Sequence, residues 1–218
     1  RFPFGLLDSA GNLHLVWQDT RSRRGGTEHD IFYEKYDKQT RQISNPRQLS
    51  FSSVFCSLCD TGRPISVIDS KDNIHVFWYQ EFNMNHNRGD VYYTRIDKSG
   101  TITIPNRRLT NTPSGFAGVT DAIIDSTDTI HLIGSTIPNI GDPQILNMVF
   151  YMNLDTNGNI LVPLKTLTNH RAYSTGVASL EFDSKNNIHV VFDAIVSFFT
   201  PFNLYHMKLD SSGNILKQ

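Results

Sequence analysis

A short segment recurs four times along this chain, and the recurrence constrains the fold more than any other feature. Each copy opens with Asp-Ser and carries a histidine six positions after the aspartate. The aspartate–histidine pairs are Asp8 and His14, Asp69 and His75, Asp125 and His131, and Asp183 and His189. Consecutive aspartates are 56 to 61 residues apart. A regular period of this size indicates one structural unit repeated along the chain.

Each repeat continues with a second element in which aromatic and β-branched residues alternate with polar ones. These elements are Ile31–Asp37, Val91–Asp97, Phe150–Asp155 and Leu204–Asp210. In the first three repeats a short strand follows and ends in Leu49-Ser50, Leu109-Thr110 and Leu167-Thr168. Turns rich in Asp, Ser, Asn and Gly separate the segments. The pattern predicts four strands per repeat and no helix.

Four-stranded units at this period are typical of β-propeller blades, because each blade buries its faces against its neighbours. We therefore predict an all-β chain that forms one β-propeller domain over residues 1–218, or a section of a larger propeller. The four visible four-stranded blades are expected at about residues 1–52, 62–112, 118–168 and 176–218. A section of a propeller has open blade edges, which favour further blades or self-association.

The turns after the second element resemble the Asp-box of sialidase-like propellers. They include Asp97-Lys98-Ser99-Gly100 and Asp210-Ser211-Ser212-Gly213. Isoleucines replace the tryptophan expected after the box, at Ile102, Ile160 and Ile215, and Asp37-Lys38-Gln39-Thr40 lacks the glycine. The resemblance implies a propeller with degenerate Asp-boxes, found in secreted or cell-surface proteins.

Sialidases of that superfamily use an arginine triad, a tyrosine nucleophile with a glutamate partner, and an acid/base aspartate. The arginine motif that opens those enzymes is absent here, because Arg63-Pro64-Ile65 has a different order. The resemblance therefore implies a non-catalytic member of the superfamily.

Charge and composition exclude several classes of partner. The chain has 20 Lys and Arg against 21 Asp and Glu, for a formal net charge of −1. A general nucleic-acid binder needs a basic surface, so no nucleic-acid partner is expected. The longest apolar run, Val190–Phe199, is much shorter than the ~20 residues of a membrane helix, so no membrane insertion is expected. No nucleotide or phosphate motif is present, and no cofactor is predicted.

The repeated histidines and aspartates are predicted to be structural. They occupy equivalent places in four blades, so they are spread around the propeller rather than gathered at one site. We expect the histidines to be hydrogen-bonded near the first hairpin and the aspartates to form Asx turns.

Functional residues are expected where the repeats differ. The hairpins that join strands one to two and three to four are short and uniform, whereas the other connections vary in length and chemistry. Variable loops on a rigid scaffold are the usual place for binding sites. The candidate ligand-binding residues are Arg21, Arg23, Arg24, His29, Glu81, Asn83, His86, Arg88, Phe198 and Phe199. Arginines and amides suit an acidic sugar or a peptide carboxylate, and the phenylalanines suit a sugar ring or a partner protein.

Two cysteines lie in the first blade-to-blade loop. Cys56 and Cys59 form a CxxC pair, which predicts either a local disulfide or two loop thiols. A zinc site would need further ligands, for which His29 or His86 would have to serve, and no metal is predicted.

These features together predict a non-catalytic extracellular recognition module. Its partner is expected to be a glycan or an extracellular protein, bound through the variable loop face. A sialidase-like glycoside hydrolase is one alternative. A structural element of a cell-surface assembly is the other.

Overall fold

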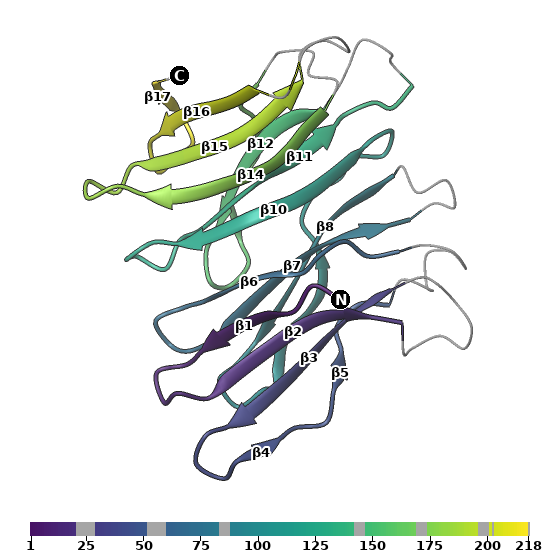
Figure 1. The fold of residues 1–218 in the computed structure, drawn as a ribbon, viewed down its shortest axis with the longest axis vertical. Helices are drawn as coiled ribbons and strands as arrows, with labels where there is room; N and C mark the ends of the chain where they lie inside the picture. Colours follow the sequence, from purple (N-terminus) through teal and green to yellow (C-terminus); the bar gives the residue numbers. More distant parts are fainter. Residues whose placement is uncertain are drawn as a thin grey trace. The chain divides into compact units, whose positions relative to one another are not determined.

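The computed structural model describes residues 1–20, 29–51, 60–82, 88–141, 147–168, 174–195, 201 and 203–217. These residues form seventeen strands with turns between them, and no helix occurs in these ranges (Figure 1). The all-β prediction is confirmed. The chain divides into two compact units, Arg1–Asn111 and Thr112–Gln218.

The first unit contains repeats 1 and 2. Repeat 1 is the antiparallel series β1 (Phe4–Leu7), β2 (Leu13–Asp19), β3 (Asp30–Asp37) and β4 (Gln42–Ile43), with β5 (Arg47–Gln48) also paired to β3. Repeat 2 is the series β6 (Ile65–Ile68), β7 (Ile74–Glu81), β8 (Gly89–Ile96) and β9 (Ile102–Arg108). In repeat 1 the fourth strand is interrupted at 44–46, where Pro46 has no N–H to give to a ladder.

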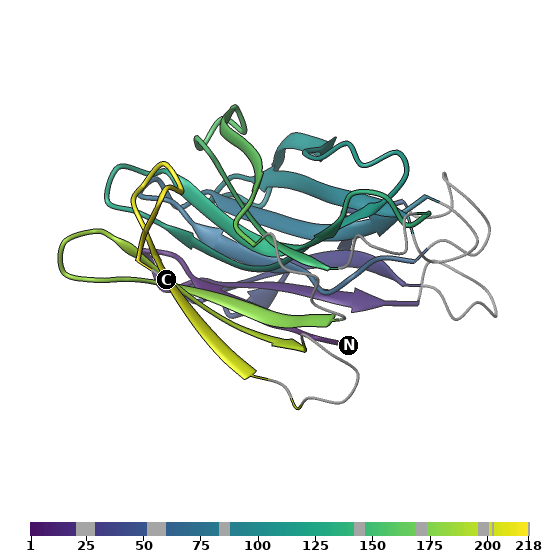
Figure 2. The same ribbon diagram turned by 90° about the horizontal axis from the view of Figure 1, so that it is seen from above.

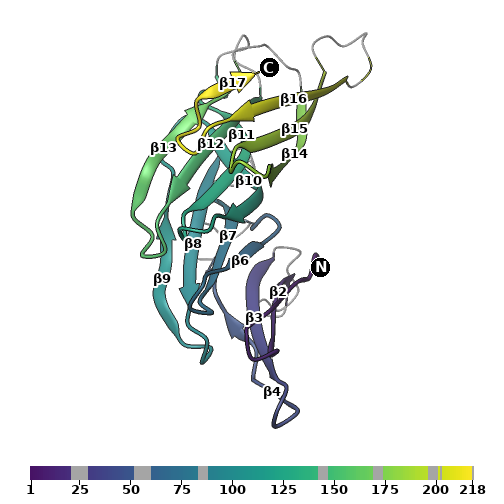
Figure 3. The same cartoon turned by 90° about the vertical axis from the view of Figure 1, so that its left-hand side faces the viewer.

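The second unit contains repeats 3 and 4. Repeat 3 is the antiparallel series β10 (Phe116–Ile124), β11 (Ile130–Ile137), β12 (Met148–Leu154) and β13 (Ile160–Thr166). Repeat 4 is the series β14 (Ser174–Phe182), β15 (Ile188–Ile195), β16 (Asn203–Leu209) and β17 (Ile215–Lys217). Figure 3 shows this last series as a fan of neighbouring strands that ends at β17.

The two hairpin turns of each repeat lie at the same end of its sheet, as Figure 2 shows for the β14–β15 and β16–β17 turns. We call this the hairpin end, and the opposite end, where the second strand ends and the third begins, the loop end. The first aspartate of each hairpin builds the turn. Asp69 Oδ1, for example, accepts the backbone N–H of Asn73 at 2.8 Å. A residue with positive φ lies three positions after the aspartate, and Gly11, Asp72, Asp128 and Asn186 fill this place.

The hydrophobic core of each unit lies between its two repeats. In the first unit Val16, Ile31 and Tyr33 of repeat 1 pack with Val76 and Trp78 of repeat 2. Strand β2 alternates between buried and half-buried residues, because only one face of a strand points into this core.

The second unit has the same arrangement. Ile133, Val149 and Tyr151 of repeat 3 pack with Val190 and Phe192 of repeat 4. Within each unit, the first repeat therefore gives one face of its sheet to the second repeat.

Candidate functional site

The hairpin end holds a polar cluster that recurs in every repeat. In repeat 1 the His14 Nδ1 lies 2.8 Å from the Tyr33 hydroxyl, and Nε2 lies 3.3 Å from Asp8 Oδ2. Repeats 2 and 3 repeat this geometry with His75, Tyr93 and Asp69, and with His131, Tyr151 and Asp125. The histidines are hydrogen-bonded beside the first hairpin, as the sequence predicted.

Burial sets the charge of these clusters. Burial lowers the pKa of His14 and of His131 below the usual 6.5, although the neighbouring aspartates oppose the shift. Burial also raises the pKa of Tyr33. It opposes ionisation of Asp69, but hydrogen bonds from His75 and Asn73 outweigh it and lower the pKa of that carboxyl. At neutral pH the clusters of repeats 1 and 3 therefore hold a neutral imidazole beside a carboxylate, which is a structural arrangement.

Repeat 4 departs from this pattern. His206 takes the place of the tyrosine, and its Nε2 lies 2.8 Å from His189 Nδ1. Lys208 Nζ donates to Asp183 Oδ2 at 2.7 Å, and this contact, first among several, lowers the pKa of Asp183. The cluster is more open to solvent than its three counterparts.

Three of the predicted binding residues lie in the part of the chain that the structure describes. His29 precedes β3, Glu81 ends β7, and Arg88 precedes β8. His29 and Glu81 are buried, whereas Arg88 is exposed. The remaining candidates lie outside the described residues, namely Arg21, Arg23, Arg24, Asn83, His86, Phe198, Phe199, Cys56 and Cys59.

Asp60 links His29 to Glu81 at the loop end of the first unit. The His29 backbone N–H donates to Asp60 Oδ1 at 2.6 Å, and the imidazole Nδ1 lies 3.3 Å from both carboxylate oxygens. The Asp60 N–H donates to Glu81 Oε2 at 2.9 Å, and the Glu81 N–H donates to the Asp60 carbonyl at 3.0 Å. Two carboxyl groups and an imidazole therefore come from three separate segments. About a third of the Asp60 side chain remains exposed.

Two glutamines extend this cluster. The Gln18 amide at the end of β2 donates to the Thr61 carbonyl, and the Thr61 hydroxyl donates to the His29 carbonyl at 3.1 Å. The Gln80 amide on β7 donates to the Asp60 carbonyl at 3.3 Å. Gln80 Oε1 is buried and has no hydrogen-bond partner among the residues that the structure describes. We call His29, Asp60, Glu81, Gln80 and Gln18 the loop-end cluster.

Other acidic residues at the loop end are structural. The Ser50 hydroxyl donates to Asp30 Oδ1 at 2.8 Å, and the same Ser50 oxygen accepts the Ile31 N–H at 2.8 Å. Asp90 and Thr110 repeat the same contact at 2.6 Å. The Leu-Ser/Thr motif therefore ties the end of the fourth strand to the start of the third. Because it recurs, it belongs to the scaffold.

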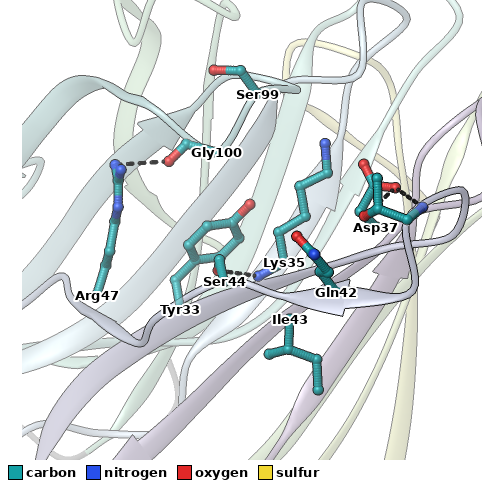
Figure 4. Close-up of a pocket in the computed structure, with 10 residues that line it drawn as sticks. Tyr33, Lys35, Asp37, Gln42, Ile43, Ser44, Arg47, Ser99 and Gly100 are labelled. Carbon is teal, nitrogen blue, oxygen red and sulfur yellow. Dashed lines mark hydrogen bonds between the residues drawn. The ribbon is translucent and has the colours of Figure 1, made fainter.

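A cavity of about 370 Å³ lies at the hairpin end of the first unit (Figure 4). It opens beside the interrupted fourth strand of repeat 1. Arg47 Nη1 donates to the Gly100 carbonyl at 2.9 Å and Lys35 Nζ donates to the Lys98 carbonyl at 2.6 Å. Both cations thus bind the β8–β9 turn, and none of the predicted binding residues lines the cavity. The cavity is a groove between two packed repeats.

In the described ranges, no group of three or more His, Cys, Asp or Glu side chains is arranged to hold a metal ion. No helix there is long and apolar enough to span a membrane.

Comparisons with known proteins reveal similarity at the level of structure. No family model matches the chain, and no curated protein does. A Hadza microbial sialidase superposes with a TM-score of 0.68 at 14% identity, over 100% of this chain and 46% of that one. An ulvan lyase, a polysaccharide lyase solved with -[GlcA(1-4)Rha3S]-, gives 0.62 at 13% identity, over 97% and 56%. An exo-1,5-α-L-arabinanase from a bovine ruminal metagenomic library gives 0.57 at 9%, over 99% and 76%.

These likenesses show the fold. The chain has the all-β architecture of sialidase and arabinanase propellers. It spans 46% to 66% of the length of the first three structures that it matches.

Of the loop-end cluster, the sequence predicted His29 and Glu81 as binding residues but did not indicate Asp60, Gln18 or Gln80. No repeated sequence motif lies next to Asp60, so no pattern singles it out. A signal did exist for Gln80, because it continues the apolar row Ile74, Val76 and Trp78 on one face of β7. A polar residue in such a row breaks the period of two and indicates a special environment.

Proposed function

We propose that this chain is a secreted or cell-surface recognition module that binds a glycan at the loop-end cluster without cleaving it. The observation that carries the proposal is the Asp60 bridge between His29 and Glu81. It gathers polar side chains that occur once rather than in every repeat. A polar cluster that serves no repeated structural purpose is a candidate binding site.

The chemistry of the cluster suits a carbohydrate. Carboxylates accept hydrogen bonds from sugar hydroxyls, and amides and imidazoles both donate and accept. Asp60 is partly exposed, so it can reach a ligand, while Glu81 holds its backbone in place. The superposed sialidase, lyase and arabinanase support a glycan over a protein partner.

The test is an oligosaccharide array with neutral, uronic acid and sialylated members, probed with the whole chain. We expect reproducible binding that is lost in Asp60→Asn, which keeps the side-chain size and removes the charge. His189→Asn is the matched control, because it alters a half-exposed histidine at the hairpin end of repeat 4. A blank array with folded protein contradicts the proposal, and binding that survives Asp60→Asn places the site elsewhere.

A carbohydrate-cleaving enzyme is the second candidate, and one observation favours it. The Asp60 carboxyl lies beside the His29 imidazole, and the Glu81 carboxyl binds the Asp60 backbone N–H. Carboxyl groups and imidazoles are the groups that acid–base catalysis uses. Incubating each array hit with the chain and measuring new reducing ends or unsaturated products separates the two. Turnover that Glu81→Gln abolishes would replace the binding proposal with the enzymatic one.

A further inference from the structure

Within each unit, the face that one repeat turns toward the next is covered at fixed positions. On the second and third strands of repeat 1 these positions are Val16 and Ile31, which are 1% and 0% exposed. In repeat 3 they are Ile133 and Val149, at 0% and 1%. In both units the side chains that cover them come from the sheet of the following repeat.

The strand register identifies the same positions in repeat 4. Val16 pairs with Tyr33 and Ile133 with Tyr151, and the matching pair is Val191 with His206. Val149 lies two residues before Tyr151 on the third strand of repeat 3, and the equivalent residue, two before His206, is Leu204. Val191 is 37% exposed and Leu204 is 76% exposed. Repeat 4 therefore keeps apolar residues at positions that repeats 1 and 3 bury.

A hairpin turn also covers this face in repeats 1 and 3. The turn of repeat 4 lies on Tyr151 of repeat 3, where the tyrosine hydroxyl donates to the Ser211 carbonyl at 2.9 Å. In repeat 2 the turn at Gly100 lies against Tyr33 of repeat 1. The equivalent place in repeat 4 holds His206, which is exposed. An imidazole offers a polar ring atom there, as the tyrosine hydroxyl does.

We propose that this face of repeat 4, formed by His189, Val191, Leu204 and His206, is a docking surface for a further propeller blade. Its occupant is a four-stranded sheet that presents a row of aliphatic and aromatic side chains, as Val190 and Phe192 do toward repeat 3. A hairpin turn of that sheet lies over His206. Figure 3 shows β15 and β16, the two strands that carry the surface.

Single exposed apolar residues are normal on protein surfaces, but Val191 and Leu204 occupy positions whose equivalents in repeats 1 and 3 are buried. Leu161 in repeat 3 is also exposed, at 56%, yet repeat 3 already carries repeat 4 on its next-facing side. Leu161 therefore lies outside the blade-to-blade contact. This makes it a matched control for Leu204.

The test extends the full chain at its C-terminus with a second copy of residues 167–217, which includes the connection before repeat 4 and repeat 4 itself. Leu204→Asp is then measured in the original and in the extended chain by thermal unfolding. We expect a change of no more than about 1 °C in the original chain, because the site faces water. In the extended chain we expect the first transition to fall by about 5–10 °C, because the carboxylate becomes buried. Leu161→Asp should change neither chain by more than about 1 °C.

Three outcomes overturn the proposal. A large loss of stability from Leu204→Asp in the original chain means that the surface is already covered within the molecule. Equal, small effects in both chains mean that it does not accept a blade. A dimer of the original chain in light scattering that Leu204→Asp dissociates makes a second copy the occupant.

Discussion

The hairpin end and the loop end of the first unit are both rich in buried polar residues, but they differ in repetition. At the hairpin end the same Asp, His and Tyr occur in repeats 1 and 2 with hydrogen-bond lengths that agree within 0.1 Å. At the loop end, the described part of the chain holds no second copy of the contacts among His29, Asp60 and Glu81. The difference separates residues that form the scaffold common to the repeats from residues whose contacts occur at one location.

The two ends also differ in how completely their polar groups are paired. His75 has a partner on each ring nitrogen and no exposed side-chain surface. At the loop end Gln80 Oε1 has no partner within the described ranges, and Asp60 reaches solvent. A fully paired network gains nothing from a ligand, whereas an incompletely paired one can bind.

The largest effect is expected from His75→Ala. The change removes the hydrogen bonds that His75 makes with the buried Asp69 carboxylate and Tyr93 hydroxyl, and it adds a cavity. We expect a loss of about 4 kcal/mol in the free energy of unfolding, measured by urea titration.

The comparison predicts opposite outcomes at the loop end. His29→Ala should cost about 1–2 kcal/mol of stability and should abolish glycan binding, because the backbone contact of His29 to Asp60 remains while the imidazole is lost. His75→Ala should retain binding when measured below its unfolding transition. If His75→Ala abolished binding in the folded state, the division between scaffold and site would be wrong.

A loss of stability somewhat smaller than that of His75→Ala is expected at the turns of the hairpin end. Gly213 has a φ of 71°, and a Cβ there would lie 2.3 Å from Tyr151 Cδ1, against a ring that cannot move away. We expect Gly213→Ala to cost about 3 kcal/mol.

Gly11 provides the matched control for this change. Its φ is 80°, but a Cβ would meet only the flexible Lys38 side chain, at 3.0 Å. Gly11→Ala should cost about 1 kcal/mol, since only the backbone strain remains. Equal costs in urea titrations of the two variants would show that the turn of repeat 4 does not pack on Tyr151.

Much of the scaffold was predictable because its residues repeat. The Asp-Ser hairpin, the histidine six positions later and the terminal Leu-Ser/Thr pair all have local geometric roles. Asp69 binds residues two and four positions ahead of it, so its role can be read from spacing. The all-β fold follows from these turns together with the alternation between them.

The loop-end cluster was only partly predictable because its contacts are distant in sequence. His29 lies 31 residues from Asp60, and Asp60 lies 21 residues from Glu81. Composition of the variable loops indicated His29 and Glu81. Asp60 joins the cluster because the start of repeat 2 lies against the end of β7. No local sequence pattern predicts this packing.

The last predicted effect is on the pH dependence of stability. It tests whether the hairpin-end histidines are as buried as their contrast with the loop end requires. The pKa values of His14 and His131 are lowered in the folded state, chiefly by burial. The unfolded chain therefore takes up protons from about pH 6.5 downward while the folded chain does not, so stability falls as the pH drops below that value. Each histidine contributes a slope of at most about 1.4 kcal/mol per pH unit. The lowered pKa values of Asp8 and Asp69 add a second loss only as the pH falls below about 3.8.

Urea midpoints measured from pH 7.5 to 5 should therefore decrease, and His131→Asn should make the decrease shallower because one titrating group is gone. A midpoint that stays constant over this range would show that these imidazoles are solvated in the folded state, and the hairpin end would then lose its distinction from the loop end.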